Sequence, residues 1–305
     1  MKILVAETAG FCFGVRRAVE MAEALARESD DGICTYGPLI HNDTAIADLK
    51  SQGVCPLPAD IDSIDRESDS PEWGNGSGSR IIMIRAHGVG KGTEAALKSR
   101  FGTVVDATCP FVKKIHRLVE EHSKAGEQIV ILGSKSHPEV VGIRGWVGGD
   151  SFVAADETEA SALDLDPEKR VCIVAQTTFH FNKFQDLVEI IKEKVYDVIA
   201  YNTICSATEE RQAEAARLAG KVDKMLVIGG MDSSNSRKLF EICQGIVDTQ
   251  FLQGAEDLDL DVLSSVACIG ITAGASTPHY IIEEVQEKCH QRNKKKVLSR
   301  CWRKA

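Results

Sequence analysis

Short apolar segments alternate with polar turns and amphipathic stretches along most of this chain. Nine apolar segments predict β-strands, and a polar turn rich in Gly or Ser follows each of them. They open the sequences KILVAETAGFC, GICTYGPLIHN, RIIMIRAHGVG, TVVDATCPFV, QIVILGSKSHPEV, VCIVAQTTF, VIAYNTICSAT, KMLVIGGMDSSNS and ACIGITAGAS. A 3.6-residue period predicts helices over 15–28, 93–101, 181–195 and 280–291. Strands that alternate with helices predict parallel α/β sheets covered on both faces.

The turns between these strands and helices hold polar or reactive residues at regular intervals. In chain order they are Cys12, His41, His87, Cys109, His137, Thr177, Cys205, Ser233 and Ser276. The three cysteines are 97 and 96 residues apart, and the next junction residue follows each of them by 29, 28 and 28 residues. This spacing predicts a threefold internal repeat of about 95 residues. The repeats are 12–108, 109–204 and 205–285, and the strand in 1–11 joins the third.

Two segments fall outside the repeat. Residues 60–80 are acidic and rich in Ser and Gly, which is typical of a surface loop inserted into the first repeat. Residues 286–305 form a basic C-terminal tail, and we expect this tail to be solvated.

Composition narrows the classes of function. The 305 residues include 36 Lys and Arg against 45 Asp and Glu, a net charge of −9, which disfavours a general nucleic-acid binder. No apolar run reaches the roughly 20 residues that span a membrane, and no targeting segment is recognisable, so we expect a cytoplasmic protein. Ten cysteines without a secretion signal indicate a reducing compartment rather than a disulfide framework.

The cysteines divide into two groups. Cys34, Cys172 and Cys268 lie inside apolar strands, where a thiol usually acts as a small apolar side chain. Cys12, Cys109 and Cys205 instead lie in polar turns at equivalent positions of the repeat. Because no CxxC occurs, a metal site must combine distant cysteines, and three thiolates suit a soft metal or an iron–sulfur cluster. On spacing alone, these three cysteines are either such ligands or packing residues.

The other junction residues also allow two interpretations. His41, His87 and His137 carry positive charge when protonated and are candidates for binding an anion. Glu139 follows His137 closely and is either a proton donor or an ordinary first-turn carboxylate of a helix. The turns MDSSNS and TAGAS are either helix caps or a phosphate-binding cradle of hydroxyl, amide and backbone N–H groups. No Walker motif is present, and no convincing GxGxxG follows a strand.

Nine motifs taken together resemble one family. GFCFGVRRA, GPLIHN, AHGV, DATCPFVKKIH, SHPEVVG, QTT, ICSATEERQ, SSNS and TAGAS occur in the order found in the LytB/IspH family, the 4-hydroxy-3-methylbut-2-enyl diphosphate reductases. The resemblance covers residues 1 to 285. It implies a trefoil-like arrangement of three small parallel-sheet α/β domains around a central iron–sulfur cluster.

The resemblance also implies residue roles. Cys12, Cys109 and Cys205 would ligate one [4Fe-4S] cluster whose fourth iron stays open. Glu139 would supply protons and Thr177 would hold the substrate hydroxyl in a relay with Glu139, so both are expected to be catalytic. The diphosphate would be bound by His41, His87, His137, Ser233, Ser234, Asn235 and Ser276. Asp232 departs from the family pattern, in which Asn often precedes SSN, and a carboxylate there disfavours diphosphate binding unless it points away.

The implied reaction is a reductive dehydroxylation. (E)-4-hydroxy-3-methylbut-2-enyl diphosphate would give isopentenyl and dimethylallyl diphosphate, the last step of the non-mevalonate isoprenoid pathway. The expected partners are this allylic diphosphate and an electron donor, ferredoxin or flavodoxin, with no nucleic acid or membrane, and we expect a monomer. Two alternatives remain: a non-redox hydro-lyase with an open iron, and a non-catalytic protein that is a zinc-stabilised binding module or an iron–sulfur sensor.

Overall fold

The computed structural model describes residues 1–30, 32–60, 81–263 and 266–302. Two compact units make up the chain. Unit 1 comprises Met1–Phe13, His41–Ala45 and Ser206–Ala305, and unit 2 comprises Gly14–Ile40 and Ile46–Cys205. Each unit is described by itself below.

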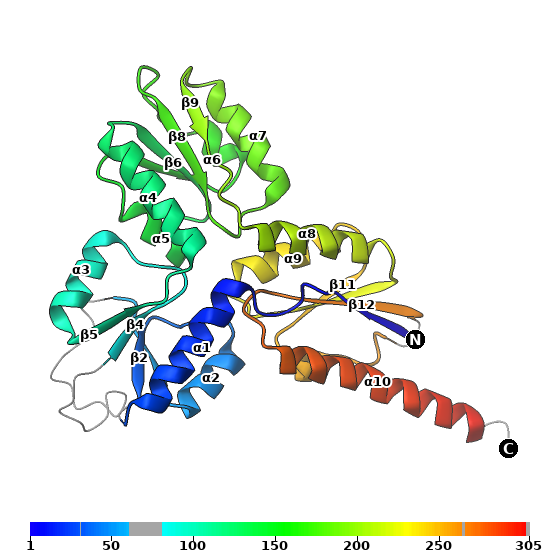
Figure 1. Cartoon of the computed structure of the whole chain (residues 1–305). Coiled ribbons are helices and arrows are strands. Elements are labelled where there is room, and N and C mark those ends of the chain that lie inside the picture. Colours follow the sequence, from blue (N-terminus) through cyan, green and yellow to red (C-terminus); the bar gives the residue numbers. More distant parts are fainter. Residues whose placement is uncertain (31, 61–80, 264–265, 303–305) are drawn as a thin grey trace. The chain divides into compact units, whose positions relative to one another are not determined.

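Unit 1 contains one parallel sheet of four strands (Figure 1). The strands are β1 (Lys2–Val5), β10 (Lys224–Ile228), β11 (Thr249–Leu252) and β12 (Cys268–Ala273), in the spatial order β11-β10-β12-β1. The unit also contains the helices α8 (Ser206–Ala219), α9 (Ser234–Gln244) and α10 (His279–Trp302), and the short 3₁₀ turn η3 (Ala255–Asp257). The N-terminal strand therefore completes a sheet whose other strands come from the last third of the chain.

Unit 2 contains two further parallel sheets of four strands each. The first has the order β3-β2-β4-β5, with β2 (Ile33–Tyr36), β3 (Val54–Leu57), β4 (Ile81–Ile84) and β5 (Thr103–Asp106). The second has the order β7-β6-β8-β9, with β6 (Gln128–Leu132), β7 (Ser151–Ala154), β8 (Val171–Ala175) and β9 (Val198–Ala200). The helices named with these sheets are α1 (Phe13–Glu28), α2 (Asp43–Ser51), α3 (Lys91–Arg100), α4 (Pro110–Lys124), α5 (Pro138–Arg144), α6 (Glu157–Ser161) and α7 (Phe181–Lys192).

The three sheets share one topology. In each, the first strand of the repeat pairs with an edge strand on one side and with the third strand on the other, and the third strand pairs with the fourth. β1 takes the place that β5 and β9 occupy in the other two sheets. The predicted α/β class with three small parallel sheets is confirmed, as are the nine predicted strands and the four predicted helices.

The sequence analysis missed one strand in every sheet. These are β3, β7 and β11, and each lies at a sheet edge. The segments VCPL, SFVA and TQFL are four residues long, and β3 contains Pro56. A short edge strand is recognised mainly by the neighbour with which it pairs, so its own residues carry little signal.

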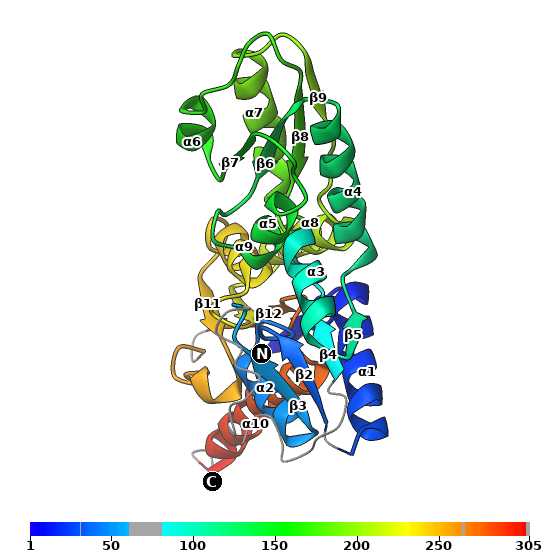
Figure 2. The ribbon, with the colours of Figure 1, turned by 90° about the vertical axis from the view of Figure 1, so that its left-hand side faces the viewer.

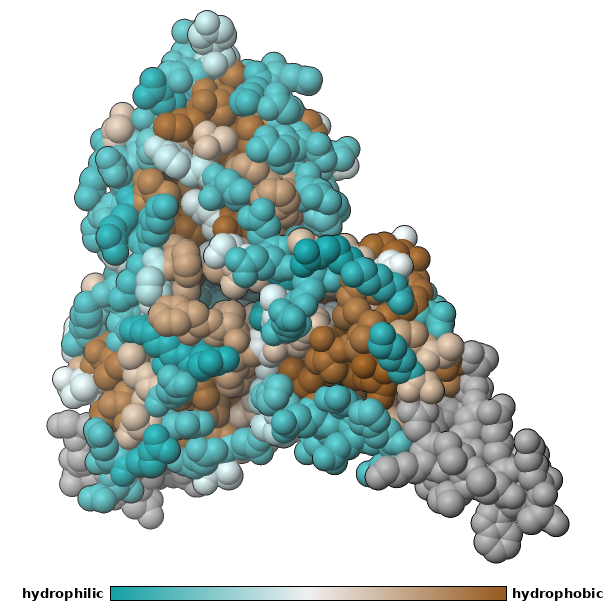
Figure 3. Space-filling view, turned by 45° about the vertical axis from the view of Figure 1, so that its right-hand side comes forward, coloured by the Kyte–Doolittle hydropathy of each residue, from teal (hydrophilic) through white to brown (hydrophobic). Residues whose placement is uncertain are grey.

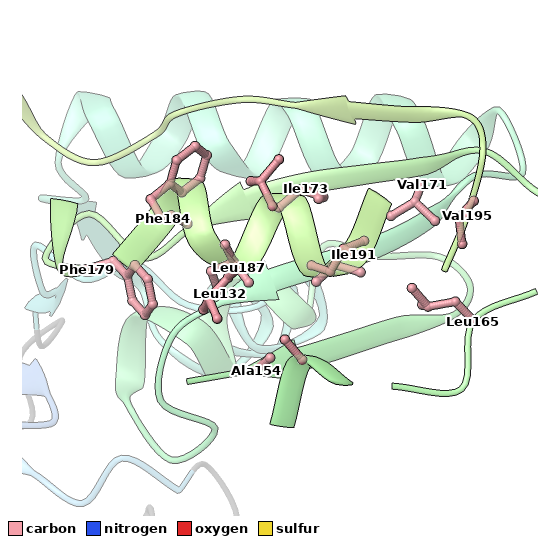
Figure 4. Close-up of a cluster of buried hydrophobic side chains, with 14 of the residues drawn as sticks. Leu132, Ala154, Leu165, Val171, Ile173, Phe179, Phe184, Leu187, Ile191 and Val195 are labelled. Carbon is pink, nitrogen blue, oxygen red and sulfur yellow. The ribbon is translucent and has the colours of Figure 1, made fainter. Parts of the chain in front are cut away.

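The core around α7, on the second sheet of unit 2, illustrates how a helix is held on a sheet (Figure 4). Phe184, Leu187 and Ile191 recur at helical spacing on α7 and point toward Ile173 and Leu132 on β8 and β6. All five side chains are at most 3% exposed. Burial of each one contributes about 1.5–3 kcal/mol, so this apolar stripe fixes the helix on the sheet.

Backbone and side-chain bonds connect the two sheets within unit 2. The Trp146 indole N–H donates to the Val89 carbonyl over 2.9 Å, and the Lys91 N–H donates to the Gly145 carbonyl over 3.1 Å. Figure 2 shows α3 and α5, the helices next to these bonds, close to each other. The first two predicted repeats therefore contribute to one compact unit. The repeat boundaries at 108/109 and 204/205 remain a prediction.

Two segments, 60–80 and 286–305, were predicted to fall outside the repeat. The predicted insertion 60–80 lies outside the described residues, except for Asp60. The predicted division between residues 285 and 286 falls inside α10, because no Gly or Pro interrupts the helical sequence there. No described helix is both long and apolar enough to cross a membrane. On the face in Figure 3, teal polar residues lie between the brown apolar areas.

Candidate active site

The three motif cysteines occupy the same place in the three sheets. Each follows the strand in the fourth position: Cys12 follows β1, Cys109 follows β5 and Cys205 follows β9. The backbone N–H of each donates to a carbonyl in the turn after the third strand, namely Ala275 (3.3 Å), Ala86 (3.0 Å) and Thr177 (3.0 Å). Since the fold repeats these bonds three times, the cysteines are positioned by their backbone rather than by their side chains.

Exposure separates these cysteines from the buried Cys34, Cys172, Cys243 and Cys289, but not from Cys55 and Cys268, which are also half-buried. Cys12, Cys109 and Cys205 are half-buried, and each is a free thiol. Cys172 and Cys243 are fully buried, and burial raises their pKa values to about 12 and about 11. Metal ligation requires a thiolate. The raised pKa values disfavour a thiolate at Cys172 and Cys243, so these two cysteines are poor candidates for metal ligands.

A close approach on α1 makes room for one motif thiol. A Cβ atom at Gly14 would lie 2.7 Å from the Cys109 sulfur. Any side chain at residue 14 would displace that thiol or the start of α4. Cys109, which lies 95 residues further along the chain, therefore requires a glycine at residue 14, the second glycine of GFCFG.

Glu139 and Thr177 form the most tightly bonded pair of the site residues. One carboxylate oxygen of Glu139 accepts the Thr177 backbone N–H at 2.6 Å, and the other accepts the Thr177 hydroxyl at 2.7 Å. Glu139 is 2% exposed and Thr177 is 8% exposed. The carboxylate therefore bonds to the turn after β8 and does not cap its own helix, α5. Instead His137 is the N-cap of α5, and its Nδ1 accepts the Glu139 N–H at 3.2 Å.

The same threonine connects this carboxylate to a motif cysteine. Thr177 receives the Cys205 N–H on its carbonyl while its own N–H and hydroxyl bind Glu139. The Thr203 hydroxyl also bonds to both backbone groups of Ala175, at 2.8 and 2.6 Å, and so holds the segment before Cys205 against β8. The carboxyl group, the hydroxyl group and the backbone of the cysteine are consequently one hydrogen-bonded assembly.

Two histidines of unit 2 lie together. The rings of His87 and His137 are 5.5 Å apart between centroids and meet edge to face at 77°. His87 follows β4 and His137 follows β6, so the bonds between the two sheets bring the two turns together. Because Nδ1 of His137 accepts a bond from Glu139, the neutral ring carries its proton on Nε2.

The turn after β10 in unit 1 gathers buried hydroxyl and amide groups. Ser233 is the N-cap of α9 and accepts hydrogen bonds from the Ser236 N–H and hydroxyl. Asn235 is 4% exposed, and neither amide atom has a hydrogen-bond partner within the described residues. Asp232 is exposed, so its carboxylate does not join Ser233 and Asn235 in the interior.

The end of β12 and the turn after it contain two more hydroxyl groups. Ile228 of β10 pairs with Ala273 of β12, and the Ile228 carbonyl accepts the Gly274 N–H at 2.8 Å. Ser276 follows in this turn and is 9% exposed. The Thr272 hydroxyl is fully buried and has no partner among the described residues. Buried polar groups normally have partners, so the orphaned Asn235 amide indicates a polar ligand at the turn after β10.

His41 approaches the same turns. A side chain at Gly230 would overlap the His41 carbonyl oxygen, so the two backbones are in close contact within unit 1. The next residue, Asn42, caps α2 by accepting the Ala45 N–H at 2.9 Å. The histidine is thereby held beside the Ser233 turn, although more than 180 residues separate them in sequence.

An arginine and a glutamate of α8 hold the segment that leads to Cys12. Arg211 is 4% exposed, and its guanidinium donates to the Thr8 carbonyl at 2.9 and 2.5 Å and to the Gly10 carbonyl at 2.8 Å. The Glu214 carboxylate accepts both the N–H and the hydroxyl of Thr8, and the N–H of Glu7. Burial raises the Glu214 pKa, but these hydrogen bonds outweigh it and the pKa is lowered.

Comparison with known proteins now adds to this geometry. The family model described as LytB protein matches residues 3–290. The chain belongs to the LytB family. It is 40% identical over 285 residues to the 4-hydroxy-3-methylbut-2-enyl diphosphate reductase of Clostridioides difficile (strain 630), covering 93% of this chain and 98% of that protein. The reductase of Aquifex aeolicus (strain VF5) is 39% identical over 293 residues, with 95% and 96% covered.

Solved structures of LytB proteins are also similar. One described as (E)-4-hydroxy-3-methyl-but-2-enyl diphosphate reductase, the terminal enzyme of the non-mevalonate pathway, is 38% identical with a TM-score of 0.66. The match covers 95% of this chain and all of that chain. The E-1-hydroxy-2-methyl-but-2-enyl-4-diphosphate reductase from Plasmodium falciparum is 26% identical with a TM-score of 0.84, and 94% and 87% are covered. The predicted resemblance to the LytB family is therefore confirmed.

The structure changes one detail of the predicted LytB repeat. The turn after the third strand of each sheet is closed by the same backbone bond, from Gly88 to Arg85, Phe179 to Gln176, and Thr277 to Gly274. By this register the equivalents of His87 and Ser276 are Thr178, not Thr177. Thr177 instead matches Ala86 and Ala275, whose carbonyls also bind motif cysteines. The sequence analysis placed the junction residue of the second repeat at Thr177, one residue too early, because the end of a strand cannot be located from the sequence alone.

The sequence analysis did not assign roles to Arg211, Glu214 and Gly14, although all three lie in or beside LytB motifs. Arg211 and Glu214 look like ordinary charged residues of an exposed helix, and only their contacts with residues 7–10 reveal their role. Gly14 lies in the first turn of α1, just before the predicted helix 15–28, and carries no signal of its own. No pattern within a single segment could have identified them.

The residues present fit the groups that the LytB resemblance implies. Three half-exposed thiols at equivalent backbone positions are the ligand type of an iron–sulfur cluster. The orphaned amide of Asn235 and hydroxyl of Thr272, with Ser233 and Ser276, fit an anion with several acceptor oxygens.

Proposed function

We propose that this LytB protein is a 4-hydroxy-3-methylbut-2-enyl diphosphate reductase that forms isopentenyl and dimethylallyl diphosphate. The observation that carries the proposal is the assembly of Glu139, Thr177 and Cys205, which links a buried carboxyl group to a motif cysteine through one threonine. The relatives named above carry the same activity in their names.

The proposed cofactor is one [4Fe-4S] cluster held by Cys12, Cys109 and Cys205, with one iron open. When bound, such a cluster supplies electrons and Lewis acidity. The bonds that position the three cysteines support this assignment, since each thiol extends from a backbone fixed in the same way.

Glu139 is the proposed proton donor. The reaction breaks the allylic C–O bond, consumes two electrons and two protons, and releases water, while a new C–H bond forms at either end of the allyl group. A carboxyl group that is 2% exposed and bonded through both oxygens is held in one orientation, as proton transfer to a leaving hydroxyl requires. Thr177 would bind the substrate hydroxyl with the oxygen that already donates to Glu139.

The diphosphate would be bound by histidines, hydroxyls and an amide. The proposed residues are His41, His87, His137, Ser233, Ser234, Asn235 and Ser276. Asn235 is the strongest of these on the evidence of the structure, because both of its buried amide atoms have no other partner in the described residues. Charge-assisted hydrogen bonds from such groups to phosphate oxygens hold the substrate for the reaction.

The proposed setting follows from the same activity. The substrate is an allylic diphosphate, the electron donor is ferredoxin or flavodoxin, and the protein works as a cytoplasmic monomer. We propose no nucleic-acid or membrane partner.

An anaerobic assay tests this function. Protein purified without oxygen is analysed for iron and sulfide and then incubated with the substrate, dithionite and methyl viologen. We expect about four irons and four sulfides per chain, as a [4Fe-4S] cluster requires, and both products only when reductant is present. Turnover without reductant would indicate the hydro-lyase, and colourless protein that contains zinc would indicate the binding module.

A further inference from the structure

The proposed reduction needs electrons from outside the chain. The sequence has no Walker motif and no convincing GxGxxG after a strand, so a bound nucleotide cofactor is disfavoured as their source. The carrier must therefore approach near a motif cysteine. Cys109 and the helices beside it belong to unit 2.

Two helices of unit 2 begin beside Cys109. Figures 1 and 2 both show the starts of α1 and α4 side by side. The Arg17 guanidinium on α1 donates to the Ala107 carbonyl at 3.2 Å, and Gly14 lies against the Cys109 sulfur. Because Cys109 is the N-cap of α4, the first turns of both helices surround it.

The first charged residues of both helices are cations. Arg16 and Arg17 on α1, and Lys113, Lys114 and Arg117 on α4, come before any acidic residue of either helix. The first acidic residues are Glu20, four residues after Arg16, and Glu120, three residues after Arg117. This concentration of cations stands out in a chain whose net charge is −9.

Three of these cations are available on the surface. Lys113 pairs with Asp106 at 2.5 Å, and Arg17 bonds to Ala107, so both are engaged in the fold. Arg16, Lys114 and Arg117 are exposed and form no ion pair with a described residue. Phe111 comes shortly before Lys114 and Arg117 on α4 and is 44% exposed. We call these four residues the basic face.

We infer that the basic face docks an acidic one-electron carrier protein that reduces the enzyme, an inference that rests on the proposed function. The cations complement an acidic partner, and the half-buried Cys109 beside them brings the partner close to the proposed cluster. Phe111, about one helical turn before Lys114 on α4, adds an exposed apolar side chain. A small charged face suits electron-transfer complexes, which bury little area and dissociate readily.

Charge reversal on the face tests the inference. The holoenzyme variant Arg16→Glu/Lys114→Glu/Arg117→Glu is compared with wild type in two assays, one with reduced ferredoxin and one with dithionite and methyl viologen. We expect KM for ferredoxin to rise about tenfold or more, because steering charges change association by 10–10³-fold. Turnover with the chemical donor should stay within about twofold, since none of the three side chains is placed in the site.

Direct binding gives a second readout. The affinity of oxidised ferredoxin for the holoenzyme is measured by titration calorimetry at low and high salt. Wild type should lose affinity as salt rises, because screening weakens exposed charges, and the variant should show a much flatter dependence. If the triple glutamate variant loses its cluster, the neutral variant Arg16→Gln/Lys114→Gln/Arg117→Gln replaces it, with a smaller rise in KM.

A matched control changes the same total charge elsewhere in unit 2. Lys124, Lys169 and Lys192 are 69%, 47% and 48% exposed and each comes before a strand, at the opposite ends of the sheets from the motif cysteines. Their triple Glu variant should keep the wild-type KM for ferredoxin. An equal rise in the control, or no rise in the face variant, would overturn the inference. Failure of wild type with the chemical donor would instead contradict the proposed function.

Discussion

Both carboxylate oxygens of Glu139 accept hydrogen bonds from Thr177, one from its backbone N–H at 2.6 Å and one from its hydroxyl at 2.7 Å. The two residues come from the turns after β6 and β8, which are neighbouring parallel strands. Parallel strands place such turns at the same edge of a sheet, where α/β proteins bind ligands. Five predictions follow from the arrangement of this and the other site residues.

The first prediction concerns the proton donor. Glu139→Gln keeps the size of the side chain and one acceptor oxygen but removes the acidic proton, so turnover should fall by about 10²–10⁴-fold. Iron content should not change, because the glutamine contacts no motif cysteine directly. Reductase turnover and iron are measured on one anaerobic sample, and near wild-type turnover would remove Glu139 from the mechanism.

The second prediction concerns the metal ligands. Cys109→Ser should deplete the iron of purified protein, since a serine hydroxyl is a poor ligand for an iron–sulfur cluster. Cys172→Ser is the matched control, because Cys172 is fully buried in β8 and burial raises its pKa to about 12. Iron and sulfide per chain are measured anaerobically for both. Full iron in Cys109→Ser would contradict the assignment.

The third prediction separates binding from stability at Asn235. Asn235→Ala should weaken inorganic diphosphate binding by roughly tenfold or more, because hydrogen bonds to a charged group are worth about 1.5–3 kcal/mol. The free energy of unfolding without ligand should not fall, since the amide has no partner to lose. Calorimetric titration and urea unfolding measure the two effects. Gln244→Ala, exposed at the far end of α9, should change neither.

The fourth prediction concerns the segment before Cys12. Arg211→Ala would leave the carbonyls of Thr8 and Gly10 without their buried donor, and should lower the free energy of unfolding by about 3 kcal/mol. The iron of the purified protein should fall as well, although every cysteine is present. Arg217→Ala on the exposed side of the same helix is the control. Unchanged stability and iron content in Arg211→Ala would show that the bonds from Arg211 to Thr8 and Gly10 do not position Cys12.

The fifth prediction is a dependence of stability on pH. Burial lowers the pKa of His116 from 6.5 to about 4, and the ring stacks on Trp146 at 5.2 Å. The unfolded chain binds the proton more tightly, so stability is lost as the pH falls from about 6.5 through about 4. The full loss is about 3 kcal/mol. His116→Phe should reduce this loss in urea unfolding at pH 7 and pH 4, whereas the exposed His290→Gln should not.

Local sequence patterns were sufficient for the elements that carry their own signal. The strands β6, β8 and β10 are five residues long, mostly apolar and buried throughout, and the turns after them contain His137, Thr177 and Ser233. The amphipathic period of α7 likewise matches the face that packs on Ile173. Such signals exist because burial of one face is imposed residue by residue.

The register of the repeat and the edge strands required the fold. Thr178 matches His87 and Ser276 only because backbone bonds close the three turns at the same position. β3, β7 and β11 are strands only because a neighbour accepts their hydrogen bonds. Neither property is contained in the residues of one segment.

By itself, therefore, the sequence determined the α/β class, the threefold spacing of Cys12, Cys109 and Cys205, and the LytB motifs. Only the tertiary structure decided that Glu139 bonds to Thr177 rather than capping its helix, and that Arg211 clamps the segment before Cys12. The physical reason is the range of the interactions. Periodicity and turn chemistry act over a few neighbouring residues, whereas these bonds join residues 38 and about 200 positions apart, and they form only when the sheets are assembled.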